Sequence, residues 1–144
     1  MMAESAPQSL VLAPRDLAPR DLIDYEAVRV GGDLPVVSFL VTSADVEDYG
    51  QSVGTPGCRS AIATMHLLAI TLAAITERMP LPATCVHVGQ ELEWERAVVP
   101  DARIDVRFGL VSRRTAGGST LSAFSLLLTS DGLEVARGRI LLQS

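Results

Sequence analysis

The sequence predicts an α+β domain in which an antiparallel sheet wraps around one long central helix. Apolar residues between 61 and 75 lie all round the axis of a predicted helix, and a helix that is apolar on every face is buried on every face. Segments that alternate apolar and polar residues follow it, which is typical of strands with one buried face. Because only mutual burial satisfies both kinds of element, we expect the strands to surround the helix.

Length and composition set the limits of the prediction. The chain has 144 residues, of which 48% are hydrophobic and 4% aromatic, so it can form one domain with an aliphatic core. The net charge is −5 and the 12 basic residues are scattered arginines, which argues against a nucleic-acid partner. Cys58 and Cys85 offer neither a disulfide framework nor a metal-binding spacing. We therefore predict free thiols in a reducing cytoplasm, with no cofactor and no metal.

No membrane partner is expected either. The N-terminus lacks the basic and apolar regions of a signal peptide. The most apolar run, residues 61–75, is shorter than the roughly 20 residues that cross a bilayer. We expect a cytoplasmic protein.

The elements follow one another in a simple order. Residues 1–22 are rich in Ala, Pro and Ser and contain the tandem repeat "APRDLAPRDL", so we expect a flexible tail ahead of one domain over 23–144. A strand is predicted near residues 36–41. Thr42 and Asp45 have the spacing of a capping box, which predicts a short helix there. Ser60 is a candidate cap for the central helix, which should run to about Arg78 and stop at Pro80.

The second half of the chain predicts four strands. In residues 84–98, Val86, Val88, Leu92 and Trp94 alternate with His87, Glu91, Glu93 and Glu95. Residues 103–114 repeat the pattern with Ile104, Val106, Phe108 and Leu110 pointing one way. The sequences "AGG" at 116–118 and "DG" at 131–132 predict hairpin turns into the last two strands. A sheet curled around one helix in this way is the hotdog fold, and its open edge strand favours pairing with a second copy, so we expect a dimer.

The sequence also resembles a known family. The segment "YEAVRVGGDLPVVSFLVTSADVEDYGQSVG" resembles the opening of MaoC-like acyl dehydratases, the (R)-specific enoyl-thioester hydratase branch of the hotdog superfamily. The segment "SAIATMHLLAITLA" resembles their central helix, and residues 89–142 resemble their C-terminal half. The resemblance spans residues 24–143. It implies an acyl-CoA or acyl-carrier-protein thioester as substrate, in fatty acid or polyketide metabolism, and the addition or removal of water.

The catalytic signature of that family is absent. Family members carry Gly-Asp-x-Asn-Pro-x-His between the short helix and the central one, and its Asp and His activate a water molecule. Here Gly54 stands at the place of the Gly, Thr55 at the place of the Asp, and no histidine follows until His66. The start of the central helix remains, and its backbone N–H groups are suited to polarise a thioester carbonyl.

Other residues near this loop are candidates for the missing roles. The catalytic candidates are His66, Thr55 and Cys58, and the candidates for substrate binding are Tyr49, Gln51, Arg59, Ser60 and Thr64. Arg113 and Arg114 are candidates for binding the phosphates of the carrier. Each has a plainer interpretation: a histidine satisfied in the core, small loop residues, or exposed charges beside a turn. His87 with its neighbouring glutamates is interpreted as a solvated strand face, with a metal site as the alternative.

Three functions remain open on the sequence. The first is a divergent dehydratase or hydratase with replaced catalytic groups. The second is a non-catalytic subunit of a heteromeric hotdog dehydratase, for which the missing motif is the motivation. The third is an acyl-thioester hydrolase, supported by the fold alone. We favour the first because hydroxyl groups and His66 are retained near the helix start.

Overall fold

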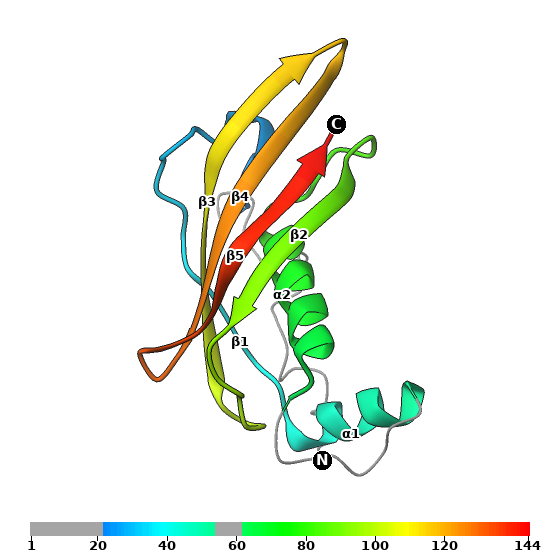
Figure 1. Ribbon diagram of the computed structural model, residues 1–144, viewed down its shortest axis with the longest axis vertical. Helices are drawn as coiled ribbons and strands as arrows, with labels where there is room; N and C mark the ends of the chain where they lie inside the picture. The colour runs from blue at the N-terminus through cyan, green and yellow to red at the C-terminus, as the bar shows by residue number, and fades with distance from the viewer. Residues whose placement is uncertain (1–21, 54–61) are drawn as a thin grey trace.

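The computed structural model describes residues 22–53 and 62–144, and its sheet curls around one helix as predicted (Figure 1). The first element of the described residues is the 3-10 helix η4 (Tyr25–Ala27). The remaining elements are β1 (Val37–Leu40), α1 (Ser43–Ser52), α2 (Thr64–Arg78), β2 (Val86–Trp94), β3 (Arg103–Ala116), β4 (Ser119–Ser130) and β5 (Leu133–Gln143). The sheet order is β1-β3-β4-β5-β2, and every neighbouring pair is antiparallel. The tail predicted for residues 1–22 lies, apart from Leu22, outside the described residues.

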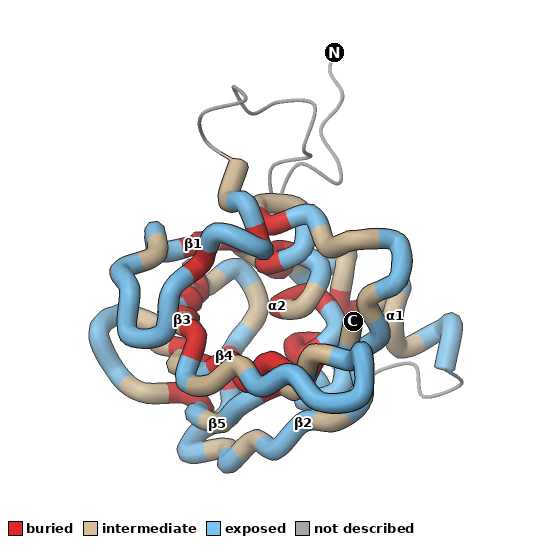
Figure 2. Tube along the Cα trace, turned by 90° about the horizontal axis from the view of Figure 1, so that it is seen from above, coloured by how far each residue is buried: buried red, intermediate tan, exposed pale blue. Residues whose placement is uncertain are grey.

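The alternating pattern of β3 builds the core as expected. Ile104, Val106, Phe108 and Leu110 are all buried, and Figure 2 shows the buried side of the sheet turned toward α2. The α2 residues Leu67, Ala74 and Ile75 meet them from the other side, and each is at most 1% exposed. The core is therefore one layer of aliphatic side chains between helix and sheet.

The two predicted turns join the strands. The β3–β4 hairpin turns at Gly117 and Gly118, which have φ values of 60° and 83°. The β4–β5 hairpin turns at Asp131 and Gly132, with φ values of 52° and 78°. Positive φ at both central residues is what a two-residue type I′ turn requires, which explains the Asp-Gly sequence.

The start of α2 differs from the prediction. The helix begins at Thr64, and its N-cap is Ala63, which makes no side-chain capping hydrogen bond. The N–H of Ile62 instead donates to the carbonyl of Val98, at 2.8 Å. This bond holds the incoming chain extended against the segment between β2 and β3. Ser60, the predicted cap, lies outside the described residues, and the predicted end at Arg78 is confirmed.

One face of α2 is not covered. We expected burial on every face, but Met65 is 61% exposed, and Ala69 and Ala73 are exposed as well. These residues recur every four positions and form a stripe on the side away from the sheet. A single five-stranded sheet covers only one side of a helix, so the prediction of complete burial is wrong for the isolated chain.

A bulge in β2 also overturns the predicted strand faces. The register with β5 shifts between His87 and Gly89, so Val88 is the extra residue. His87 consequently pairs with buried Leu142 and shares the helix-facing side with Leu92 and Trp94. We had placed His87 on the face of Glu91 and Glu93. Among the described residues no group of three or more His, Cys, Asp or Glu could hold a metal ion, and no helix there is long and apolar enough to span a membrane.

Candidate active site at the start of the central helix

The predicted site residues fall into three groups. Thr55, Cys58, Arg59 and Ser60 lie outside the described residues. Tyr49 and Gln51 lie on α1, and Thr64 and His66 lie in the first turn of α2. Arg113 and Arg114 lie far along β3.

A single connection holds the starts of both helices. In α1, Thr42 Oγ1 accepts a hydrogen bond from the Asp45 N–H (3.1 Å), and the Asp45 carboxylate accepts one from the Thr42 N–H (3.0 Å). This is the capping box that the sequence predicts, and it is confirmed. The carboxylate of Asp101, in the β2–β3 connection, accepts from the N–H (3.3 Å) and the hydroxyl (3.1 Å) of Ser43. The same connection holds Ile62 through Val98, so α1 and the start of α2 are fixed relative to each other.

This arrangement stacks Tyr49 on His66. The two ring centroids are 4.2 Å apart and the ring planes differ by 2°. His66 is only 9% exposed, and its Nδ1 has no hydrogen-bond partner among the described residues. A buried polar atom without a partner is uncommon in native structures and calls for an explanation. The plainer interpretation of His66, a core histidine satisfied by a hydrogen bond, is therefore not supported at Nδ1.

Burial sets the charge state of this histidine. Removal from water lowers the pKa of His66 below its ordinary value, and the negative charge of Asp45 opposes that shift. The net direction is downward, so the imidazole is neutral at pH 7 and able to accept a proton. A neutral imidazole at the start of a helix is a chemically competent base.

The remaining candidates at this end are more exposed. Thr64 is the first residue of α2 and is exposed, as is Gln51 in the last turn of α1. The N-cap Ala63 has no side-chain acceptor, so among the described residues no capping side chain occupies the first-turn N–H groups of α2. Their partial positive charge favours a developing oxyanion.

Arg113 has a structural role that the sequence did not reveal. Its Nη2 donates to the carbonyl of Tyr25 (2.9 Å), its Nη1 to that of Val28 (3.1 Å) and its Nε to the hydroxyl of Ser122 (3.2 Å). Its guanidinium also lies 5.0 Å from the centre of the Tyr25 ring. These contacts fasten η4 to the sheet and leave Arg113 no free edge for a phosphate. Arg114, one residue on, is exposed.

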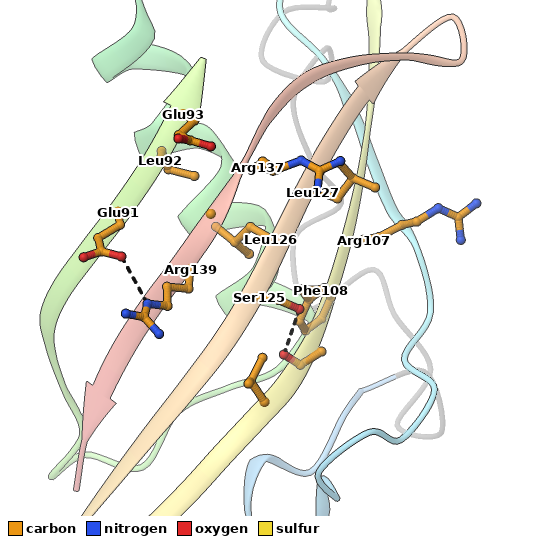
Figure 3. A pocket seen from close by; sticks show the side chains of 13 residues that line it. Glu91, Leu92, Glu93, Arg107, Phe108, Ser125, Leu126, Leu127, Arg137 and Arg139 are labelled. Atoms are coloured by element: carbon orange, nitrogen blue, oxygen red, sulfur yellow. Dashed lines mark hydrogen bonds and ion pairs between the residues drawn. The ribbon is translucent and has the colours of Figure 1, made fainter. Parts of the chain in front are cut away.

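A further groove lies elsewhere in the described part of the chain. It has a volume of about 820 Å³ and lies on the sheet face opposite α2 (Figure 3). Two of its arginines already pair with carboxylates: Arg139 Nε contacts Glu91 on the neighbouring strand β2 at 3.2 Å, and Arg137 Nε contacts Glu134 on its own strand at 2.6 Å. The Ser125 hydroxyl, at 3.4 Å, points to the Gly109 carbonyl. The groove brings together no base and nucleophile, so we regard it as an ordinary solvated sheet face.

Sequence reasoning missed the roles of two acidic residues, Asp45 beside His66 and Asp101 at the start of α1. Asp45 precedes Tyr49 by one helical turn, a spacing that places both on one face of α1. That spacing was visible in the sequence, but Asp45 was interpreted only as a cap. Asp101 gave no signal, because its role depends on a φ of 70° in a loop. Of the cysteines, Cys85 is half-buried, and burial raises the pKa of its thiol, which makes it a poor nucleophile.

Comparison with known proteins supports the fold. No protein-family model matches the sequence, and no curated protein matches it. Among solved structures, the unliganded R-hydratase PhaJ1 from Pseudomonas aeruginosa matches with a TM-score of 0.70 and 16% identity, covering 84% of each chain. The MaoC-like dehydratase from Rhodospirillum rubrum matches with a TM-score of 0.67 and 16% identity, covering 84% of this chain and 95% of that one.

A heteromeric enzyme is also similar. The HadBC complex from Mycobacterium tuberculosis, a (3R)-hydroxyacyl-ACP dehydratase, matches with a TM-score of 0.61 and 13% identity over 78% of this chain and 93% of that chain. At these identities the likeness shows the fold. The chain has the hotdog fold, and the structures that it resembles are those of MaoC-like dehydratases and (R)-hydratases. The α+β hotdog prediction is confirmed.

Proposed function

We propose that this chain adds water to, or removes it from, acyl thioesters, with His66 as the base. The observation that carries the proposal is the buried, neutral imidazole at the start of the central helix, with Nδ1 lacking a partner. The fold, shared with hydratases and dehydratases, supports the substrate class. In the hydration direction His66 takes a proton from water as the water oxygen bonds to the β-carbon, and the α2 N–H groups stabilise the enolate oxygen of the thioester. The protonated His66 then gives the proton to the α-carbon, and dehydration follows the same steps in reverse.

Other predicted residues keep supporting roles in this proposal. Thr64, the first residue of α2, and Gln51, in the last turn of α1, are both exposed, and we retain them as candidates to contact the acyl or pantetheine portion. We retain Thr55, Cys58, Arg59 and Ser60 as candidates from the sequence. Arg114 stays a candidate for a carrier phosphate, whereas Arg113 does not, because its guanidinium is occupied. Acyl-CoA or acyl-carrier-protein thioesters of fatty acid or polyketide metabolism are the proposed substrates, in the cytoplasm.

We also propose that the active form contains a second hotdog subunit. Val86 (58% exposed) and Val88 (48% exposed) lie on the open edge strand β2, and the exposed stripe of α2 adds Met65. Apolar groups at an open edge favour a partner strand. A homodimer is the first expectation, and the likeness to the HadBC complex supports a heterodimer as the alternative. Light scattering after size exclusion separates a monomer, which would contradict the proposal, from a dimer.

The test of function is a panel of enoyl, 3-hydroxyacyl and saturated acyl thioesters, with products identified by mass. The expected result is a gain or loss of one water, abolished by His66→Ala and retained by His87→Ala, the matched control on the only other histidine. Release of a free thiol would indicate a thioesterase instead. Turnover that survives His66→Ala would remove His66 from the mechanism.

The second candidate is a non-catalytic subunit, and the absent family motif together with the HadBC likeness favours it. It predicts no turnover by the purified chain and co-purification of a second hotdog protein from extract. Turnover by the isolated homodimer would exclude this candidate.

A further inference from the structure

Helix α1 presents two side chains to His66. Asp45 and Tyr49 are four residues apart, so they lie on the same face of α1, one turn above the other. The Tyr49 ring lies parallel to the imidazole at 4.2 Å. Asp45 is near enough for its charge to act on the same ring, where it opposes the lowering of the His66 pKa by burial.

We propose that Asp45 and Tyr49 are positioning residues for His66, the Tyr49 ring fixing the plane of the imidazole and the Asp45 carboxylate stabilising the imidazolium formed when His66 takes a proton. The catalytic consequence rests on the function proposed above. The structural part, a ring and a carboxylate acting together on one histidine, does not.

The geometry of the stack suits a residue that exchanges protons. Face-to-face contact restrains the ring plane and does not engage the two ring nitrogens, whose lone pair and N–H lie in that plane. The aromatic face also attracts a cation, so Tyr49 favours the protonated ring as well as orienting the neutral one. Proton transfer needs an oriented base, and misplacement by about 1 Å costs roughly 100-fold in rate.

The Asp45 carboxylate acts through its charge. Burial disfavours a charged imidazole, and only 9% of the His66 surface is exposed. A nearby negative charge offsets part of the free energy that is lost when the buried imidazole becomes protonated. Asp45 is itself held in place, because its carboxylate accepts the Thr42 N–H in the capping box.

The first experiment titrates His66 by NMR in the full chain. The chain has two histidines, so the imidazole signal that remains in a His87→Gln background belongs to His66. In that background Asp45→Asn keeps an oxygen acceptor for Thr42 and removes the charge, and the His66 midpoint is expected to move to lower pH. Asp48→Asn, an exposed acid on the same helix, is the control and leaves the midpoint in place. An unmoved midpoint in Asp45→Asn would overturn the role of Asp45.

The second experiment separates the ring from its hydroxyl. Tyr49→Phe preserves the stack, so the His66 ring-proton shifts stay close to those of the parent. Tyr49→Leu removes the ring current, so those proton shifts move downfield, and kcat falls roughly 10- to 100-fold with KM little changed. Unchanged proton shifts in Tyr49→Leu would overturn the role of Tyr49.

The two kinds of readout keep this inference distinct from the proposed function. If no thioester is turned over but the NMR changes occur, the function fails and the positioning of His66 stands. If the chain is active and the NMR signals of His66 ignore both substitutions, the function stands and this inference fails.

Discussion

Two clusters of buried and half-buried polar side chains lie at different places in this sheet-and-helix layer. The first, here called the arginine clamp, consists of Arg113, Tyr25 and Ser122. Its groups are matched: the Tyr25 hydroxyl donates to the Ser122 hydroxyl at 2.9 Å, and Arg113 donates to two carbonyls and to Ser122. The second, here called the histidine stack, consists of His66 and Tyr49, and His66 Nδ1 has no partner in the described residues.

The difference separates structure from chemistry. A fully matched buried network adds stability and leaves no group to act on a ligand. A buried polar atom without a hydrogen-bond partner lowers stability, and such atoms are retained where they serve a function. The clamp fastens η4 to the sheet, while the stack holds a base ready at the helix start. Substitutions in the two clusters should therefore affect different quantities.

The largest effect on stability is expected from the clamp. Arg113→Met should lower the free energy of unfolding by about 3 kcal/mol, because two carbonyls and a buried hydroxyl lose a charged donor. Urea unfolding measures it. Arg114→Met, one residue along the same strand and exposed, is the control and should change stability by no more than about 0.5 kcal/mol. Equal losses of unfolding free energy in Arg113→Met and Arg114→Met would show that the contacts of the arginine clamp do not stabilise the fold.

A smaller effect is expected from the tyrosine of the clamp. Tyr25→Phe keeps the ring beneath Arg113 and removes the hydroxyl that donates to Ser122. The free energy of unfolding should fall by about 1 kcal/mol, the usual net value of one hydrogen bond. A thermal or urea unfolding curve is sufficient. A loss as large as that of Arg113→Met would mean that the hydroxyl, not the guanidinium, organises the cluster.

The fold could be predicted from local patterns, but neither cluster could. Residues close in sequence determine the alternating strand from Ile104 to Leu110 and the turn at Asp131-Gly132. The structure confirms both predictions. The clamp joins Arg113 to Tyr25 across 88 positions, a contact that no local pattern encodes. The histidine was recognised from the sequence, but its stack depends on where Asp101 places α1.

The histidine stack should behave in the opposite way. At a pH of about 8, His66→Leu should change the free energy of unfolding by less than about 1 kcal/mol, because Nδ1 loses no hydrogen bond. Turnover in the thioester assay should nevertheless be lost. A stability loss like that of Arg113→Met would mean that the histidine is a structural residue after all.

The smallest expected effect is a dependence of the free energy of unfolding on pH. Burial lowers the pKa of His66 in the folded chain below its ordinary value of 6.5. As the pH falls below 6.5, the unfolded chain therefore binds a proton that the folded chain does not, and stability decreases until the folded histidine titrates too. Urea unfolding at several pH values should show the parent losing more stability than His66→Leu over this range. Parallel slopes would contradict a lowered pKa.

The bulge at Val88 has a consequence for assembly. A free strand edge is a template on which further strands can add without limit, which leads to fibres. The shift between His87 and Gly89 interrupts the ladder of β2 and leaves residues 89–94 in regular register. A strand that pairs with β2 in another register meets the bulge at Val88. The bulge therefore restricts the length and the register of any strand that pairs with this edge. The edge is thereby suited to one defined neighbour and protected against open-ended polymerisation.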